Sequence, residues 1–192
     1  MFPKTVCGRG LPVTVIAAVA QNGVIGSDGK IPWDISEDLD HFRCETVGNP
    51  VIMGRRTFEG IVDKTGEPLP DRKNIVLSNS DPDLADDVFV ASSIEAAFQE
   101  AVTMFTLDSP ADAVYVCGGQ TVYEQLLPYA DRLVITEVHQ SYDGDTYFPE
   151  WEEGDWVEIA RKESDVCDFV YYEFEEATWL EQSDEVDIQY LC

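Results

Sequence analysis

The hydrophobic pattern of the chain alternates between short apolar runs and longer stretches that mix apolar and polar residues. Short continuous apolar runs bounded by turn residues are typical of strands that are buried on both faces. The segments that fit this pattern are predicted as strands: Val13–Ala20, Pro50–Met53, Asn74–Ser78, Asp87–Ala91, Ala113–Cys117, Leu133–Val138, Val157–Lys162 and Phe169–Phe174.

Helices are predicted between most of these strands. They are Ser36–Val47, Arg56–Val62, a segment from a Ser92 cap to Phe105, and the segment that follows Gly119 as far as Tyr129. Ser92 and Glu95 have the spacing of a capping box, in which a serine cap and a glutamate three residues later satisfy helix amides. Strands separated by helices favour a mainly parallel sheet, and the last strands, with no helix between them, predict an antiparallel edge. The fold class is therefore α/β.

The charge balance of the chain is strongly acidic. Its 192 residues, 44% of them hydrophobic, suffice for one domain with a sizeable core. The net charge is −26, and a field this negative repels nucleic acid and anionic membranes, so neither is expected as a partner. The acids are spread along the chain, which favours adaptation to a high-salt cytoplasm, where self-repulsion is screened, over an ordinary acidic protein.

The cysteines and acidic clusters predict no disulfide framework and no metal site. The five cysteines are odd in number, and no pair has CxxC spacing, so reduced thiols in a cytoplasm are expected. No apolar run is long enough for a membrane helix. The acidic stretch from Asp81 to Asp87 lacks the glycine and the closing glutamate of a calcium loop.

A small basic cluster begins where the second strand ends and a helix starts. Gly54, Arg55, Arg56 and Thr57 occupy this junction, where free amides and the helix dipole favour an anion. Arginine suits phosphate well because its guanidinium can form paired hydrogen bonds. The cluster therefore predicts an anionic ligand, and surface salt bridges to the many acids are the alternative.

A second strand-to-helix junction holds two adjacent glycines. It runs from Cys117 through Gly118 and Gly119 to Tyr123, and paired glycines would let the backbone approach a pyrophosphate closely. The motif is neither G-x-G-x-x-G nor a P-loop. A plain Gly-Gly turn is the alternative interpretation.

Asp38 is the candidate acid. It lies four residues before Phe42 on one helix face and follows a fully apolar strand, so its carboxylate is expected to be poorly solvated, with a raised pKa. A group of this kind can act as an acid near neutral pH. The alternative is a first-turn acid that only complements the helix dipole. The glycine-rich loop Asn22–Lys30 predicts either a lid or a plain surface loop.

Together these segments resemble the dihydrofolate reductase family, over about Val13 to Ala177. The blocks that carry the resemblance occur in the family's order: Ile16-Ala17-Ala18, Val24-Ile25-Gly26, Pro32-Trp33, Asp38-Leu39, Phe42, Val51-Ile52-Met53-Gly54-Arg55, Thr57-Phe58, Leu69-Pro70, Arg72, Asn74, Gly118-Gly119, Val122-Tyr123, Thr136 and Gly144-Asp145-Thr146. Any one block is weak evidence, but the ordered set is highly specific. The acidic composition points to a halophilic member of the family, such as a haloarchaeal one.

The resemblance implies an eight-stranded mixed, mostly parallel sheet flanked by about four helices. It also implies reduction of 7,8-dihydrofolate with NADPH for one-carbon metabolism, with Asp38 anchoring the pterin ring and supporting protonation at its N5. Thr136 would share a hydrogen-bond network with Asp38. The implied substrate-binding residues are Ile16, Asp38, Leu39, Phe42, Ile61, Leu69, Arg72 and Thr136, with Arg72 pairing with the glutamate carboxylate of the substrate.

The implied cofactor-binding residues come from four parts of the chain. They are Ala18, Ile25, Gly26 and Ile31 near the nicotinamide, Gly54, Arg55, Arg56, Thr57, Ser78 and Asn79 at the adenosine phosphate end, and Cys117, Gly118, Gly119, Gln120, Thr121, Val122 and Tyr123 at the pyrophosphate and nicotinamide. The stretch from Ser27 to Ile31 would be the lid. Antifolates are the expected inhibitors, and a monomer is the expected state.

Several features depart from compact bacterial members of the family. Residues 1–12 form an N-terminal extension before a domain at 13–177, and 178–192 form an acidic tail. Val62–Glu67 is predicted as a longer loop, and Thr121 stands where many members have a basic residue. His41 is expected to be an exposed helix histidine, and a proton partner one turn after Asp38 is the alternative. The rival readings are a riboflavin-pathway pyrimidine reductase of the same fold and a folate- or nucleotide-binding paralogue without turnover.

Overall fold

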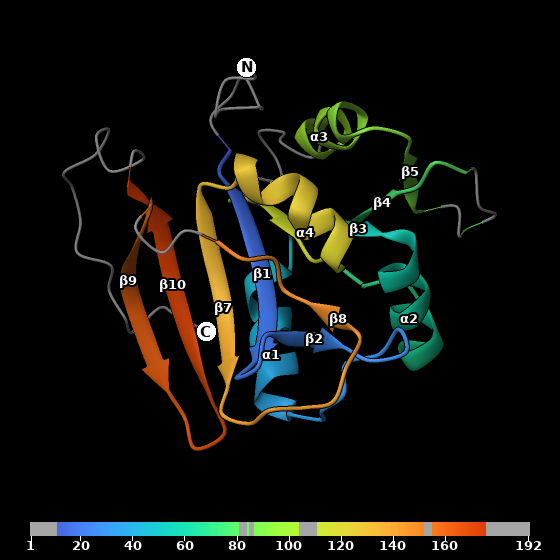
Figure 1. Cartoon of the computed structure of the whole chain (residues 1–192). Helices are drawn as coiled ribbons and strands as arrows, with labels where there is room; N and C mark the ends of the chain where they lie inside the picture. The colour runs from blue at the N-terminus through green and yellow to red at the C-terminus, as the bar shows by residue number, and fades with distance from the viewer. Residues whose placement is uncertain (1–10, 81–83, 85–86, 104–110, 152–154, 176–192) are drawn as a thin grey trace.

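An eight-stranded mixed sheet forms the centre of the structure (Figure 1), a computed structural model that describes residues 11–80, 84, 87–103, 111–151 and 155–175. The strands of the sheet are β1 (Val13–Ala20), β3 (Pro50–Gly54), β4 (Lys73–Leu77), β5 (Phe89–Ala91), β6 (Val114–Val116), β7 (Arg132–Val138), β9 (Trp156–Glu163) and β10 (Cys167–Phe174). Their order is β5-β4-β3-β6-β1-β7-β10-β9. β10 runs antiparallel to both β7 and β9 while the remaining pairs are parallel, which confirms the predicted antiparallel edge.

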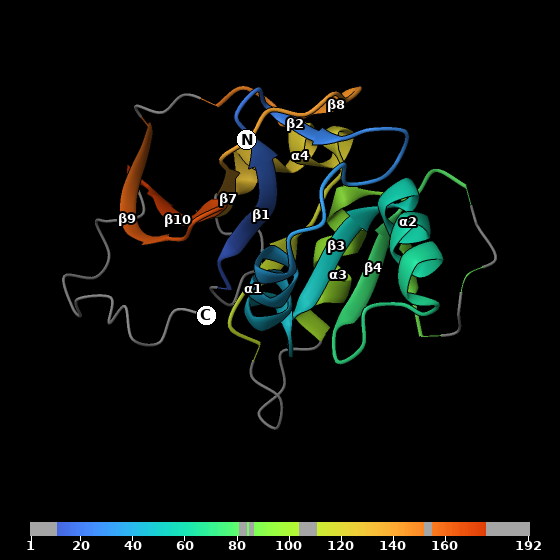
Figure 2. The same ribbon diagram turned by 90° about the horizontal axis from the view of Figure 1, so that it is seen from below.

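Helices cover both faces of this sheet (Figure 2). They are α1 (Ser36–Thr46), α2 (Arg55–Thr65), α3 (Ile94–Thr103) and α4 (Gln120–Leu126), the last followed by a short 3-10 turn, Leu127–Tyr129. The alternation of side chains along β1 separates the core into two layers. Val15 and Ala17 pack with buried residues of α3 and α4, such as Phe98 and Leu126. Ile16 packs on the opposite face with Phe58 of α2.

Two short strands lie in segments for which the sequence predicts loops. β2 (Val24–Gly26) pairs antiparallel with β8 (Thr146–Tyr147), so the predicted loop Asn22–Lys30 is wrong over Val24–Gly26. Strands this short carry too few residues to show a periodic pattern. What remains is a tight turn in which the amides of Ser27 and Lys30 each donate to the other's carbonyl, at 2.8 and 3.0 Å.

Two helix boundaries differ from prediction. α2 continues to Thr65 and ends at Gly66, whose φ of 86° is the left-handed conformation that commonly closes helices. The predicted loop Val62–Glu67 therefore begins one helical turn later. The cap of α3 is Ser93 and not Ser92, because the Ser93 hydroxyl accepts a hydrogen bond of 3.1 Å from the amide of Ala96.

Parts of several predictions lie outside the described residues. They are most of the N-terminal extension, the acidic tail, the end of the third helix at Phe105 and much of the acidic stretch from Asp81 to Asp87. Leu11 is described and is buried in the core with Val13. Cys44 is disulfide-bonded, so the prediction of reduced thiols is wrong for this residue, whereas Cys117 and Cys167 are free.

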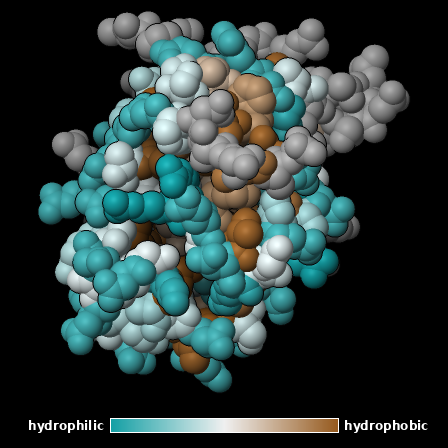
Figure 3. Space-filling view, turned by 90° about the vertical axis from the view of Figure 1, so that its right-hand side faces the viewer, coloured by the Kyte–Doolittle hydropathy of each residue, from teal (hydrophilic) through white to brown (hydrophobic). Residues whose placement is uncertain are grey.

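The surface on the side of α2 and β5 is mainly hydrophilic, with hydrophobic areas between the polar side chains (Figure 3). This distribution fits the acidic composition, since charged side chains must stay solvated. Of the helices described, none is both long and apolar enough to cross a bilayer.

Candidate active site

Asp38 lies in the first turn of α1, at the bottom of a small pocket. Only 7% of the residue is exposed. The pocket is lined by residues from the segment before α1, from α1 itself and from the end of α2. They are Ile31, Trp33, Ile35, Asp38, Leu39 and Lys64. The lining is largely apolar around the carboxylate of Asp38, and Lys64 is the only basic residue in it.

The surroundings of Asp38 act on its pKa in opposite directions. Burial raises the pKa and is the largest effect, and the hydroxyl of Thr136 and the indole of Trp33 offset part of it. Thr136 is buried on β7, paired in register with Ala18 of β1. The indole N–H of Trp33 meets no partner in hydrogen-bond geometry within the described residues, so Thr136 is the stronger of the two effects that lower the pKa of Asp38.

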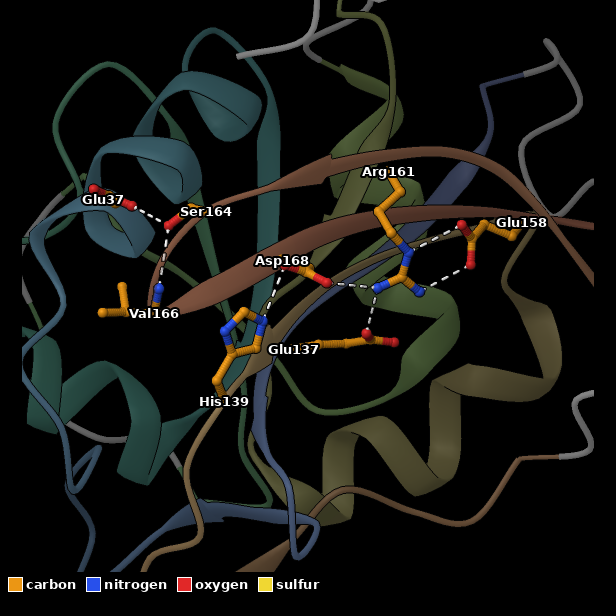
Figure 4. Close-up of polar contacts among 8 residues, drawn as sticks. All are labelled: Glu37, Glu137, His139, Glu158, Arg161, Ser164, Val166 and Asp168. Carbon is orange, nitrogen blue, oxygen red and sulfur yellow. Dashed lines mark hydrogen bonds and ion pairs between the residues drawn. The ribbon is translucent and has the colours of Figure 1, made fainter.

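Polar contacts hold α1 against the sheet at both of its ends. At the start of the helix, the Ser164 hydroxyl donates to Glu37 at 2.6 Å, which joins α1 to the turn between β9 and β10 (Figure 4). At the other end, Glu45 accepts hydrogen bonds from Tyr115 of β6 at 3.2 Å and from Tyr171 of β10 at 2.9 Å. These contacts fix the position of the helix that carries Asp38.

His41 differs from the sequence expectation of an exposed helix histidine. It is only 4% exposed, and its ring lies 4.2 Å from the ring of Phe169 and 5.9 Å from that of Tyr171, measured between centroids. The residue belongs to the face of α1 that packs on β10. Its position one turn after Asp38 placed it on the buried side, which helical periodicity could have indicated.

Arg72 is positioned by the end of α1. Three of its N–H groups donate to protein oxygens: Nε to the Thr46 hydroxyl at 3.1 Å, Nη1 to the Pro70 carbonyl at 2.8 Å and Nη2 to the Arg43 carbonyl at 3.1 Å. An arginine has five N–H donors, so two remain for a ligand. Burial lowers the pKa of Arg72, and the nearby positive charge of Arg43 lowers it further.

The other predicted substrate-binding residues lie in the core layer on the α1 and α2 face. Ile16 is buried there, and Phe42, Ile61 and Leu69 pack against the same cluster as Trp33. None of these four lines the pocket around Asp38, whereas Leu39 does and is 41% exposed. The structure thus brings the group to one face of the sheet around the Asp38 helix.

The two strand-to-helix junctions predicted to bind phosphate lie side by side. The amide of Gly54 donates to the carbonyl of Gly118 at 2.7 Å, and the bond between Gly118 and Gly119 is cis. A Cβ on Gly118 would lie 3.0 Å from the ring of Tyr123, and one on Gly119 would lie 3.3 Å from Oγ1 of Thr57. Both distances are shorter than ordinary van der Waals contacts, and the φ of 99° at Gly118 is a conformation that favours glycine.

The start of α2 carries cations where helices usually carry acids. Gly54 is its N-cap without a side-chain hydrogen bond, and the first turn contains no acid. Arg56 is exposed. Arg55 pairs with Glu59 at 2.6 Å and donates to Ser80 at 3.3 Å, so the salt-bridge alternative applies to part of this cluster. The free N–H groups of the first turn and the positive end of the helix dipole, with no acidic side chain beside them, still favour an anion.

The remaining predicted cofactor residues surround these junctions with differing exposure. Val122 and Tyr123 are buried in α4, and the Tyr123 hydroxyl donates to the Ile16 carbonyl at 2.7 Å. Burial raises the pKa of the free Cys117 thiol to about 12.

The other predicted cofactor residues are more exposed or are held by hydrogen bonds. Thr121 and Asn79 are exposed. The Ser78 hydroxyl forms a hydrogen bond of 3.2 Å with the Ser80 hydroxyl, and the Gln120 side-chain oxygen accepts one of 3.2 Å from the Tyr147 amide. Ala18 and Ile25 are half-buried, Gly26 ends β2, and Ile31 is 50% exposed.

Sequence reasoning missed Ile35 and Lys64 as pocket residues and named Trp33 only as part of a family motif. Lys64 falls in the segment predicted as a loop, so its helical position could not be anticipated. Ile35 lies directly before α1 and carries no chemical signal. Among the described residues, no group of three or more His, Cys, Asp or Glu is placed to bind a metal ion.

Comparisons with known proteins agree on one family. The family model described as dihydrofolate reductase matches residues 12–180. Dihydrofolate reductase HdrB of Haloferax volcanii is 45% identical over 83% of this chain and 81% of its own length, and dihydrofolate reductase type 3 of Salmonella typhimurium is 40% identical over 82% and 95%. A dihydrofolate reductase structure from Enterococcus faecalis, complexed with NADP(H) and RAB-propyl, aligns with a TM-score of 0.73, at 32% identity and over 85% and 96% of the two chains.

Proposed function

The chain belongs to the dihydrofolate reductase family, and from this premise we propose that Asp38 is the residue that anchors the substrate and supports its protonation. The activity is the NADPH-dependent reduction of 7,8-dihydrofolate to 5,6,7,8-tetrahydrofolate, which supplies one-carbon metabolism. The observation that carries the residue assignment is a single carboxylate, 7% exposed, in a largely apolar pocket beside Thr136 and Trp33.

The reduction adds a hydride to C6 of the pterin and a proton to the neighbouring N5. NADPH supplies the hydride when it is bound. Asp38 accepts hydrogen bonds from the N–H groups of the pterin ring, and its raised pKa keeps a proton available to the site at higher pH than an exposed aspartate would. Thr136 fixes the orientation of the carboxylate. The apolar lining excludes water, which strengthens these contacts.

Arg72 and the apolar residues on the α1 and α2 face hold the rest of the substrate. Two free N–H groups on Arg72 suit one carboxylate of the glutamate tail. Leu39 lies at the pocket, and the remaining side chains contact the ring systems. This group consists of Ile16, Phe42, Ile61 and Leu69.

The paired junctions fit a dinucleotide phosphate. A Cβ at Gly54, Gly118 or Gly119 would lie only 3.0–3.3 Å from a neighbouring atom, and the absence of side chains at these three positions would let a phosphate approach the backbone. Arg55 and Arg56 at the start of α2, with Thr57, Ser78 and Asn79, would bind the phosphate on the adenosine. The residues from Cys117 to Tyr123 would bind the pyrophosphate, and Ala18, Ile25, Gly26 and Ile31 the nicotinamide.

The test of the activity is NADPH oxidation with dihydrofolate as substrate, in low and in molar salt. We expect turnover that depends on both substrates. A riboflavin-pathway reductase would instead oxidise NADPH only with a pyrimidine substrate, and a binding paralogue would bind both ligands without turnover. Absence of turnover at every salt concentration would refute the enzyme assignment.

We further propose a cytoplasmic, monomeric enzyme that works at high salt and binds antifolates. The net charge of −26 supports the salt dependence, because screening relieves self-repulsion. The similarity to a Haloferax volcanii relative supports it independently. Sedimentation in molar salt would test the monomer, and competition of an antifolate with dihydrofolate would test inhibitor binding.

A further inference from the structure

Lys64 lies at the mouth of the Asp38 pocket and has no part in the function proposed above. It belongs to the last turn of α2 and lines the pocket together with Asp38 and Leu39. The residue is exposed, so its charge is at the entrance and not in the core. A cation at the entrance of a pocket is the first group that an anionic substrate meets.

Lys64 makes no ion pair with any acid in the described part of the chain. This is notable in a protein with 38 acidic and 12 basic residues. Lys73 pairs with Glu100, and Arg132 pairs with Glu173 at 3.0 Å. Acidic side chains that could pair with Lys64 are abundant in this chain. Because none of those described does so, the ammonium of Lys64 beside the pocket is available for a ligand.

The charge of Lys64 is close enough to be felt at the bottom of the pocket. Three titratable side chains from packed elements interact with Asp38: Lys64 of α2, Tyr123 of α4 and Cys167 of β10. Burial raises the pKa of both Tyr123 and Cys167, so both are neutral near neutral pH. Lys64 is the charged member of the three, and its field lowers the pKa of Asp38 against the larger effect of burial.

We propose that Lys64 is a further substrate-binding residue, whose ammonium holds a carboxylate of the substrate's glutamate tail at the mouth of the Asp38 pocket. The proposal rests on the proposed function, because dihydrofolate carries two such carboxylates and Arg72 has free donors for one. Ile31 and Leu39, 50% and 41% exposed, flank the entrance. They provide an apolar surface for the aromatic part of the tail, and Lys64 provides the opposite charge.

The experiment compares Lys64→Gln, Lys64→Arg and the control Arg132→Gln, which removes the same charge far from the pocket. At about 0.1 M salt, Lys64→Gln should raise the KM for dihydrofolate about two- to fivefold, the range of an exposed ion pair. The increase should shrink in molar salt, where charges are screened within about 3 Å. Lys64→Arg should retain most of the affinity, and Arg132→Gln should match the unmodified enzyme.

A second substrate separates tail binding from a general field effect. The KM for 6-methyl-7,8-dihydropterin, which has no glutamate tail, should be unaffected by Lys64→Gln. The apparent pKa that Asp38 contributes to the pH profile should rise in the same variant, because a nearby positive charge has been removed.

Three results would overturn the role of Lys64. They are an unchanged KM for dihydrofolate in Lys64→Gln, an equal loss for the substrate without the tail, and an equal effect of Arg132→Gln. Each of these three results can be obtained only if the unmodified enzyme turns over dihydrofolate. No turnover by the unmodified enzyme would instead refute the proposed function.

Discussion

The backbone amide of Asp28 donates a hydrogen bond to Oδ2 of Asp145 at 3.2 Å. This bond joins the tight turn after β2 to the loop before β8. The turn also lies against α2, where a Cβ on Gly60 would come within 3.2 Å of the Gly29 carbonyl. The segment from Ser27 to Ile31, proposed as a lid, is therefore held at two points.

Asp145→Ala should loosen this turn. The variant removes the acceptor for the Asp28 amide, and we expect faster deuterium uptake at Ser27–Lys30 together with slower turnover. The pKa of Asp145 is lowered mainly by the Thr146 hydroxyl. The contact should therefore persist above the ordinary value of 3.8 and be lost as pH falls through the lowered pKa. The control is Asp143→Ala, which removes an exposed acid from the same loop. Equal deuterium uptake in both variants would mean that the hydrogen bond between Asp28 and Asp145 does not hold the turn.

Asp38→Asn should separate activity from stability. Turnover at neutral pH should fall about 100-fold or more, the usual contribution of a positioned acid or base, while NADPH binding remains nearly intact. Because the folded-state pKa of Asp38 is raised, the native protein prefers the protonated form. Ionised Asp38 costs stability above that pKa, so the variant should melt at an equal or higher temperature at neutral pH.

The stability difference should shrink as pH falls below the raised pKa of Asp38, since both side chains are then neutral. Melting curves between acid and neutral pH measure this. Asp40→Asn, an exposed aspartate on the same helix, should change neither turnover nor melting. A near-normal rate for Asp38→Asn would rule Asp38 out as the key acid.

The double variant Arg55→Ala with Arg56→Ala tests how NADPH is distinguished from NADH. These arginines are the first two residues of α2, whose first turn contains no acid. We expect the KM for NADPH to rise far more than the KM for NADH. Equal changes would mean that the pair does not read the phosphate on the adenosine. Glu59→Gln, which releases Arg55 from its ion pair, is a matched probe of the same site.

The sequence predicted the main sheet well because its strands are buried apolar runs. β1, for example, begins and ends at the predicted Val13 and Ala20. It failed where too few residues define an element: β2 and β8 have three and two residues. It also failed for His41, where the polar character of the side chain outweighed a helical position that indicated burial, and the ring lies against Phe169 in the structure.

The candidate site was accessible to prediction only in part. Asp38, Thr136 and Leu39 come from ordered motifs, and the structure places them in or against one pocket. Lys64 could not be found as a pocket residue, because its position depends on how far α2 continues past Val62. That boundary is set by Gly66 and by packing, which a short polar stretch does not reveal.

Tyr123→Phe should destabilise the fold. The buried Tyr123 hydroxyl donates to the carbonyl of Ile16 at 2.7 Å. Its loss leaves a buried acceptor unsatisfied, which typically costs about 1–3 kcal/mol. Urea unfolding at fixed salt measures the change. Tyr129→Phe, a half-buried tyrosine in the turn after α4, should cost far less, and equal losses would mean that the hydrogen bond to Ile16 contributes nothing specific.

Arg161→Met tests how this acidic protein uses its few cations. Arg161 on β9 bridges three carboxylates: Glu158 at 2.9 Å, Glu137 at 2.6 Å and Asp168 at 2.9 Å (Figure 4). His139 adds a contact to Asp168 at 3.0 Å. Without the guanidinium, these acids would repel one another across β7, β9 and β10.

We expect Arg161→Met to lose about 1–2 kcal/mol of unfolding free energy at 0.1 M salt, because charge-assisted hydrogen bonds are lost and partial exposure limits their worth. In molar salt the loss should become smaller, since screening reduces repulsion among the freed carboxylates. Arg132→Met, which breaks one exposed ion pair, should have a smaller effect at both salt concentrations. If the loss grows with salt, or if both variants respond alike, then repulsion within the cluster is not what Arg161 relieves.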